Sequence, residues 1–173
     1  MEEVRPTMML ARHAMAVQPV TASPEMNAGD AAGLMLANDI SAIPITEDGR
    51  LVGLVTDRDL VLRVMAERKD PRSVRLADVA TTRGLETVTP DTQLCDARAL
   101  MAQRRISRLP VVKEDRLVGM LSLGDVALGS ASMRGVGEAL AEISASAATE
   151  EINPGPDLGT PDRVKSRRTA GVK

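Results

Sequence analysis

The chain contains no phenylalanine, tyrosine or tryptophan among its 173 residues. Its core must therefore be built from aliphatic side chains, with ten methionines available to fill irregular gaps. Proteins that bind single-stranded nucleic acid usually stack the bases on aromatic rings, so this composition argues against that function. Any base that the chain binds has to lie against aliphatic side chains instead.

Cysteine, net charge and long apolar runs are also scarce. The single cysteine, Cys95, excludes an internal disulfide bond and a zinc site made of cysteines. The formal net charge of −2 gives no general attraction to nucleic acid or membranes. No apolar run approaches the length needed to span a bilayer, and no signal-peptide core is present. We therefore expect a cytoplasmic globular protein that binds neither nucleic acid nor membrane.

What the chain does contain is an internal repeat. Arg50–Leu60 reads RLVGLVTDRDL, and Arg116–Val126, 66 positions later, reads RLVGMLSLGDV. The same offset pairs Pro44 with Pro110 and extends well to either side without a gap. Such a register indicates two units of similar fold. Two copies are too few for a solenoid, so we expect them to pack on each other about a pseudo-twofold axis.

Each copy reads as a buried strand followed by a helix. The apolar run Leu51–Val55 is typical of a strand that is covered on both faces. Thr56 and Asp59 then have the spacing of a helix N-terminus, and Ser122 and Asp125 repeat it in the second copy.

A hairpin turn is expected before each of these strands. In the first copy, Asp48 and Gly49 predict a tight turn, because this pair readily adopts positive φ angles. The turn of the second copy, Lys113–Asp115, lacks glycine, and we expect it to be less tight.

These features resemble a CBS domain pair, also called a Bateman module. The family pattern is an apolar-Pro-apolar strand and then Gly-apolar-apolar-[Thr/Ser]-x-x-Asp. Gly53–Asp59 (GLVTDRD) matches it closely and Gly119–Asp125 (GMLSLGD) is slightly degraded. The resemblance covers about residues 10–129. It implies an α/β fold of two tandem βαββα repeats packed with pseudo-twofold symmetry, plus a C-terminal helix and a disordered tail.

On this basis the sequence divides into six parts. They are a flexible N-terminus (1–9), the first repeat (10–69), a linker (70–75), the second repeat (76–129), a C-terminal helical segment (130–147) and a disordered tail (148–173). An amphipathic pattern around Leu140 and Ile143 predicts the C-terminal helix. The proline- and glycine-rich tail cannot bury enough apolar surface to order itself.

Residues suited to catalysis are few. His13, the only histidine, stands where the second copy has Val79, which favours an incidental or packed residue. Cys95 stands where the first copy has Gly29, and no histidine is nearby in sequence. No glycine-rich phosphate loop of the P-loop or dinucleotide-binding type is present. We therefore predict no catalytic residues, no metal site and no catalytic cofactor.

The candidate ligand-binding residues are Thr56, Asp59, Ser122 and Asp125. In one interpretation they only cap their helices, which by itself explains the spacing. In the other, hydroxyls and helix N-termini bind phosphate while the carboxylates accept ribose hydroxyls. The resemblance implies the second interpretation, with the two aspartates at the ribose and the two hydroxyl residues beside the phosphates.

Further candidates flank these motifs. Arg58 is placed to reach a phosphate, and its counterpart is Gly124, so we expect the first cleft to favour a polyphosphate. The cluster around Arg104, Arg105 and Arg108 favours a solvated surface over a ligand site. Aliphatic residues of the preceding strands are predicted to hold the base. Sheet core is the plainer interpretation, and for most of them both can hold: Ile43, Pro44, Ile45, Leu109, Pro110 and Val111.

The function that follows is a stand-alone regulatory module that signals to a partner protein. It is expected to bind an adenosine-type ligand: AMP, ADP, ATP, S-adenosylmethionine or NAD(H). A ligand-free interaction scaffold and a detached regulatory subunit of a separate enzyme remain alternatives. The resemblance implies a homodimer, since CBS pairs usually form flat dimers through their helices.

Overall fold

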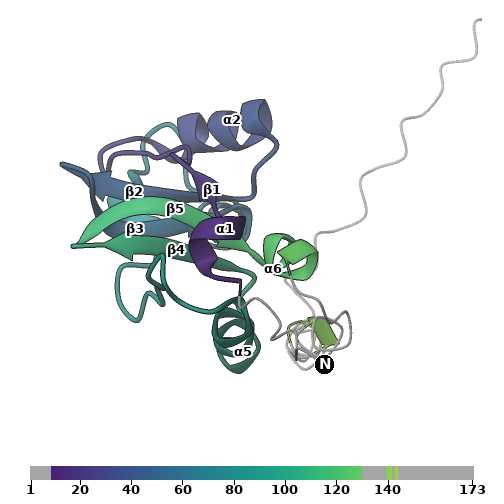
Figure 1. Ribbon diagram of the computed structural model, residues 1–173. Coiled ribbons are helices and arrows are strands. Elements are labelled where there is room, and N and C mark those ends of the chain that lie inside the picture. Colours follow the sequence, from purple (N-terminus) through teal and green to yellow (C-terminus); the bar gives the residue numbers. More distant parts are fainter. Residues whose placement is uncertain (1–8, 130–139, 142, 144–173) are drawn as a thin grey trace, which may run out of the picture.

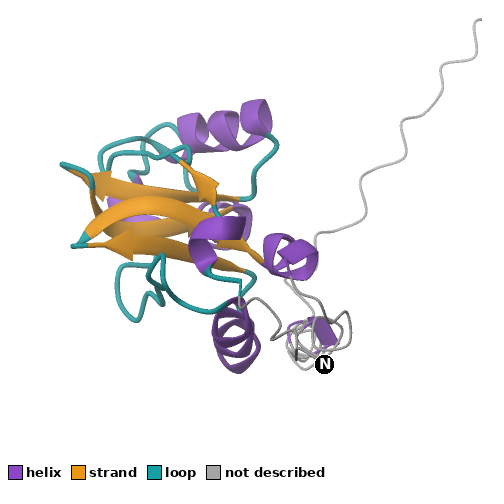
Figure 2. Cartoon of the chain, viewed as in Figure 1, coloured by secondary structure: helices purple, strands orange, loops and turns teal. Residues whose placement is uncertain are grey.

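The computed structural model describes residues 9–129, 140, 141 and 143. Its strands lie between α2 and α5, which cover opposite sides (Figures 1 and 2). The first half contains α2 (Ala28–Asn38), β2 (Ala42–Glu47), β3 (Arg50–Thr56), α3 (Asp57–Leu60) and the π-helix η1 (Val61–Met65). The second half contains α5 (Leu94–Arg104), β4 (Arg108–Lys113), β5 (Arg116–Ser122) and α6 (Leu123–Gly129). The short elements are α1 (Ala11–Ala14), β1 (Ala16–Val17) and α4 (Leu76–Val79).

The strands form one antiparallel sheet built from two hairpins. β2 pairs with β3, β4 pairs with β5, and β1 adds to β5. The hairpins meet where Arg50 lies opposite Arg116. Isolated parallel bridges join Ala22 to β2 and Val88 to β4. Each half therefore has the predicted βαββα order, and the predicted α/β class with two repeats is confirmed.

The two long helices end in the same way, although neither ends at a glycine. Asp39 follows α2 with a φ of 52°, and Arg105 follows α5 with a φ of 55°. Both left-handed residues donate their N–H groups back to carbonyls of the last helical turn, which satisfies part of the helix end. The chain then turns directly into β2 or β4.

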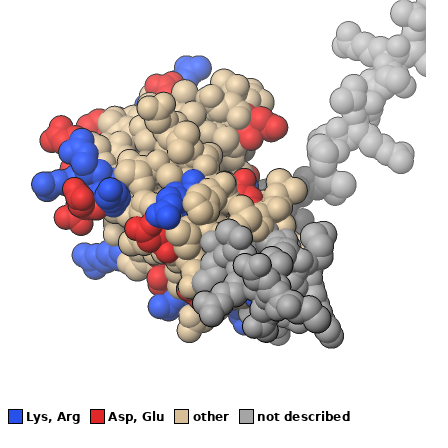
Figure 3. All heavy atoms as spheres, in the orientation of Figure 1, with Lys and Arg blue, Asp and Glu red and all other residues tan. Residues whose placement is uncertain are grey.

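The two hairpin turns are equally short, so the prediction of a looser second turn is wrong. Two residues connect the paired strands in each hairpin. Asp48 and Gly49 have φ values of 50° and 79°, and Glu114 and Asp115 have values of 50° and 62°. Positive φ at both central residues matches the right-handed twist of the flanking strands. The strand pairing therefore holds two ordinary residues in the left-handed region. Acidic and basic side chains gather at this end of the sheet (Figure 3).

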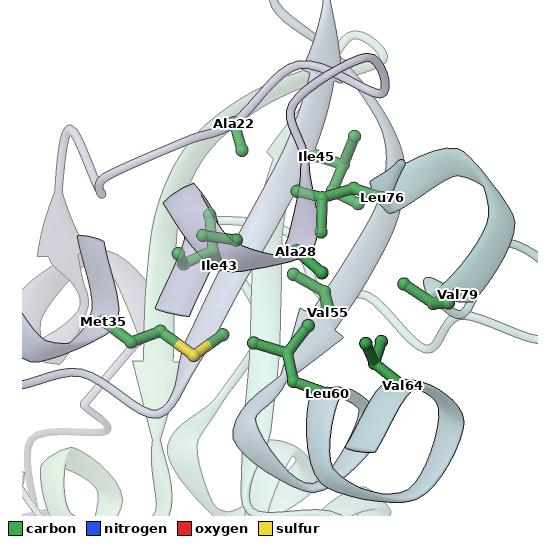
Figure 4. Close-up of a cluster of buried hydrophobic side chains, with 11 residues drawn as sticks. Ala22, Ala28, Met35, Ile43, Ile45, Val55, Leu60, Val64, Leu76 and Val79 are labelled. Atoms are coloured by element: carbon green, nitrogen blue, oxygen red, sulfur yellow. The ribbon is translucent and has the colours of Figure 1, made fainter. Parts of the chain in front are cut away.

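The halves have separate apolar cores, and the first core includes a helix from the second sequence repeat. Ile43, Val55 and Val64 of the first half cluster with Leu76 and Val79 of α4. Figure 4 shows α4 presenting its apolar side chains to this cluster. Leu76 also donates its backbone N–H to the Met26 carbonyl at 2.9 Å. Helix α4 thus completes the core of the half that precedes it.

The N-terminal helix makes the reciprocal contact. Ala11 of α1 is buried with Leu109 and Leu121 in the second core. Its N–H donates to the Thr92 carbonyl at 2.8 Å. Helix α4 of the second sequence repeat therefore packs in the first core, and helix α1 of the first repeat packs in the second core. This exchange joins the two similar units about a pseudo-twofold axis. The predicted limits of the sequence repeats stay predictions, and the packing units are offset from them.

Several sequence predictions fall on residues that the structure does not describe. Only residue 9 of the predicted N-terminal segment 1–9 is described, and the predicted tail 148–173 lies outside the described residues. Of the C-terminal segment, Leu140, Ala141 and Ile143 are helical, and Ile143 packs against the second core. Among the described residues, no helix combines the length and the apolar character that crossing a membrane requires.

Candidate functional site

The first repeated motif forms a closed capping box at the start of α3. Thr56 Oγ1 accepts the Asp59 N–H at 3.2 Å. Asp59 Oδ2 in turn accepts the Thr56 N–H at 2.9 Å and the Thr56 hydroxyl at 2.7 Å. The other carboxylate oxygen, Oδ1, lies 3.2 Å from Nη2 of Arg63. Both oxygens of Asp59 are therefore engaged by its own helix and cap.

The second motif keeps the cap but leaves its carboxylate less engaged. Asp125 Oδ2 accepts the Ser122 N–H at 2.7 Å, and Ser122 Oγ accepts the Asp125 N–H at 3.1 Å. Within the described part of the chain, Asp125 Oδ1 has no hydrogen bond and no ion pair. The counterpart of Arg63 is Gly129, which cannot form one. One oxygen of Asp125 is thus available to a ligand.

Ser122 and Asp125 line a pocket of about 410 Å³ between the two halves, here called the Asp125 pocket. This volume lies within the range of small-molecule sites, roughly 300–1,000 Å³. Part of the wall is β1 and the residues that follow it. The first half contributes a further set: Asn38, Asp39, Ile40, Ser41, Ala42 and Pro44.

The six predicted base-binding residues separate by face of the sheet. Ile43, Ile45, Leu109 and Val111 are at most 2% exposed and pack in the two cores. These four side chains are therefore core residues, and a contact of any of them with a base stays a prediction. Alternate residues of a strand point to opposite faces, and Pro44 accordingly lines the Asp125 pocket.

The two prolines have different places. Pro44 and Pro110 are both fully buried, but only Pro44 is among the residues that line the Asp125 pocket. Thr56, Arg58 and Asp59 do not line it either. The pocket therefore brings together the second motif and a proline of the first repeat.

Arg108 is the pocket residue whose place the sequence interpretation missed. We assigned it to a solvated surface, whereas it lines the Asp125 pocket. Its Nη2 donates to Ser41 Oγ of the other half at 3.3 Å, and its Nη1 donates to the Ser107 carbonyl at 2.9 Å. It also lines an adjoining hollow of about 370 Å³ with Asp39 and Asp57. The contact between the halves gives Arg108 this place, and no local pattern encodes it.

Gln18 was also missed. It lines the pocket with a φ of 51°, a left-handed value that is uncommon outside glycine. Its counterpart in the second repeat is Gly84, which has a φ of 67°. The shared positive φ shows that both repeats make the same turn here, and the first repeat carries a polar side chain at it. A glycine at one copy was the signal that could have found this turn.

The arrangement can bind a polar small molecule, and its groups do not form a metal site. Among the described residues, no cluster of three or more His, Cys, Asp or Glu side chains is placed to hold a metal ion. Available groups are the Asp125 carboxylate, the Ser122 hydroxyl and the Arg108 guanidinium. Aliphatic surface from Ile40, Pro44 and Met120 lines the same pocket, next to these polar groups.

Comparison with known proteins agrees with this architecture. One relative is the CBS domain-containing protein YhcV of Bacillus subtilis (strain 168). It is 41% identical over 130 residues, which are 75% of this chain and 91% of that protein. The CBS domain pair of protein MJ0100, solved in complex with 5′-methylthioadenosine and S-adenosyl-L-methionine, is 25% identical with a TM-score of 0.63. The match covers 70% of this chain and 94% of that one.

A protein that forms a hexamer is also similar to this chain. The hexameric CBS-CP12 protein from bloom-forming cyanobacteria is 27% identical, with a TM-score of 0.65, over 72% of this chain and 70% of that one. The model of the CBS domain matches twice, at residues 11–66 and 76–130. These two matches span both halves of the fold, and the chain belongs to the CBS domain family.

Proposed function

We propose that the chain is a regulatory module that binds an adenosine-type ligand in the Asp125 pocket and passes the bound state to a partner protein. The observation that carries the proposal is the carboxylate of Asp125. Among the described residues its Oδ1 has no partner, and it lies in a pocket of suitable size. The adenosine compounds bound by the similar CBS pair of MJ0100 support the same ligand class.

The pocket offers a complementary group for each part of such a ligand. Asp125 can accept the two hydroxyls of a ribose, as carboxylates form strong charge-assisted hydrogen bonds. Ser122 Oγ already accepts the Asp125 N–H, which leaves its hydroxyl proton for a ligand oxygen. Ile40 lines the pocket with a partly exposed side chain, beside the buried Pro44 and Met120, and offers an aliphatic contact for the base, as a chain without aromatic residues requires.

Arg108 favours the ligands that carry phosphate. Its guanidinium is always charged and presents several donors in a planar fork. Its Nη2 reaches Ser41 across the pocket, so the group is held between the two halves. AMP, ADP, ATP and NAD(H) would gain from this charge, whereas the sulfonium of S-adenosylmethionine would not. The proposal includes no catalytic role and no catalytic cofactor. It places the module in the cytoplasm.

The homodimer belongs to the same proposal. Three apolar side chains of η1 remain exposed: Val61 at 51%, Leu62 at 50% and Met65 at 69%. Adjacent exposed apolar side chains often mark a protein–protein contact. A dimer mass by light scattering at micromolar concentration is expected. It should be lost in Leu62→Glu and kept in Leu36→Glu, which changes an exposed leucine of α2. A monomeric unaltered chain contradicts this assembly.

Thermal denaturation with AMP, ADP, ATP, S-adenosylmethionine and NADH tests the ligand. At about 100 times the dissociation constant, binding stabilises a protein by about 2.7 kcal/mol. For a chain of this size that corresponds to several degrees, at about 2–4 °C per kcal/mol. Asp125→Ala removes charge-assisted hydrogen bonds worth about 1.5–3 kcal/mol each. Its affinity should therefore fall at least about tenfold.

The same measurement separates the module from a ligand-free scaffold. The first motif favours pure capping, because both oxygens of Asp59 are already engaged. If no adenosine compound raises the melting temperature of the unaltered chain, capping describes the second motif as well. The scaffold interpretation is then the correct one.

A further inference from the structure

We infer that Arg63 closes the first cleft and that the chain therefore binds one adenosine-type ligand rather than two. This inference rests on the proposed function of the Asp125 pocket. It concerns a site that the repeat predicts and that the first half's own side chains occupy. The relevant contacts join Asp59, Arg63 and Val79, and we call them the Arg63 clasp.

The clasp connects three elements with one guanidinium. Nη2 of Arg63, in η1, lies 3.2 Å from Asp59 Oδ1 in α3. Nη1 of the same side chain donates to the Val79 carbonyl at 2.5 Å. Val79 belongs to α4, the helix that the second sequence repeat contributes to the first core. Arg63 therefore spans from the motif carboxylate to the exchanged helix.

The clasp occupies the groups that a ribose would need. Oδ1 of Asp59 faces Arg63, and Oδ2 accepts two hydrogen bonds from Thr56. A ribose hydroxyl is a neutral donor, so displacing the Arg63 guanidinium would exchange an ion pair for a hydrogen bond in which only the carboxylate is charged. The Asp59 side chain is also only 16% exposed, so the ion pair is partly shielded from water. A ligand entering here has to displace Arg63 first.

Among the described residues, the second cleft has no such group. The position that corresponds to Arg63 is Gly129, and the position that corresponds to Val79 is His13. Asp125 accordingly keeps one oxygen without a partner among the described residues and lines the Asp125 pocket. A single side chain, present in one repeat and absent from the other, thus distinguishes a closed cleft from an open one.

The number of ligands bound per chain tests the inference. Isothermal titration with AMP, and separately with 5′-methylthioadenosine, should give one site per chain for the unaltered protein. Asp59→Ala should leave the affinity of that site within about twofold. Arg63→Met keeps the aliphatic stem and removes every donor, so a second, weaker site should appear. The double variant with Arg63→Met and Asp59→Ala should return to one site.

Each contrary result has a distinct meaning. Two sites in the unaltered chain, or a single site in Arg63→Met, overturns the inference while the Asp125 pocket stands. If neither probe binds the unaltered chain, the proposed function fails, and Arg63→Met then decides the clasp alone. A new site in that variant supports the clasp, and the absence of a new site overturns it. Circular dichroism and the melting temperature of Arg63→Met verify that the variant is folded.

Discussion

Asp59 and Asp125 occupy the same position in the two repeats and have different surroundings. Each accepts a backbone N–H from the hydroxyl residue three positions earlier, so both cap a helix. Asp59 also bonds the Thr56 hydroxyl and pairs with Arg63. Asp125 does neither within the described residues and faces a pocket. A repeated motif can therefore preserve the backbone of both copies while only one copy keeps the open carboxylate that the proposed binding requires.

The comparison extends to the cores, where the two halves are equivalent and mutually dependent. Each core is closed by a short helix from the other sequence repeat, α4 in the first half and α1 in the second. Asymmetry at the motifs thus rests on a symmetric framework. Variants at matched positions of the two repeats can separate what the halves share from what they do not.

The largest effect is expected from Leu76→Ala, which tests the exchange of helices. Leu76 is fully buried, and truncating such a leucine typically costs about 2–5 kcal/mol of unfolding free energy. In double-mutant cycles it should couple with Ile45→Ala, because both residues belong to the first core. Denaturant unfolding measures both quantities.

The matched control for this coupling is Val111→Ala. Val111 is the counterpart of Ile45 and belongs to the second core. Its effect should add to that of Leu76→Ala, since the two residues lie in different clusters. Coupling with Val111 and not with Ile45 would mean that α4 packs within its own sequence repeat, contrary to the structure.

A smaller effect is expected at the glycines in the middle of β3 and β5. A Cβ on Gly119 would lie 2.5 Å from Met15 Sδ and 3.0 Å from the Ala16 carbonyl oxygen. The nearest atom to a Cβ on its counterpart, Gly53, would be the Thr81 carbonyl oxygen at 3.3 Å. Overpacking usually costs about 1–3 kcal/mol, so Gly119→Ala should destabilise the chain clearly more than Gly53→Ala.

Ligand binding sharpens this comparison of the glycines. Gly119 pairs with Val17 of β1, and β1 forms part of the wall of the Asp125 pocket. Gly119→Ala should therefore also weaken the binding of AMP, whereas Gly53→Ala should not. Equal affinities in the two variants, measured by titration, would show that the position of β1 does not matter for the pocket.

The sequence predicted the features that local patterns encode. The strand pairs and both capping motifs follow from hydrophobic spacing and from residues three positions apart. It did not predict the exchange of α1 and α4, because the apolar pattern of Leu76 is the same whichever half it joins. The places of Arg108 and Arg63 were not predicted for a related reason: they depend on contacts between segments far apart in the sequence.

The smallest effect is expected at the hairpin turns, where the two halves differ by one glycine. Asp115 has a φ of 62°, and its counterpart Gly49 has a φ of 79°. A left-handed conformation costs most residues about 1–2 kcal/mol, and aspartate less, because its short polar side chain tolerates this region. Glycine removes that cost but adds backbone freedom to the unfolded chain, which offsets about 0.4–1 kcal/mol. Asp115→Gly should therefore stabilise the chain by less than about 1 kcal/mol, or raise Tm by at most about 2–4 °C. Gly49→Asp is the matched reversal and should lower Tm, because it places a side chain where glycine now adopts positive φ. If Asp115→Gly lowers Tm as well, the second turn is stabilised by the Asp115 side chain itself and the two turns are not equivalent.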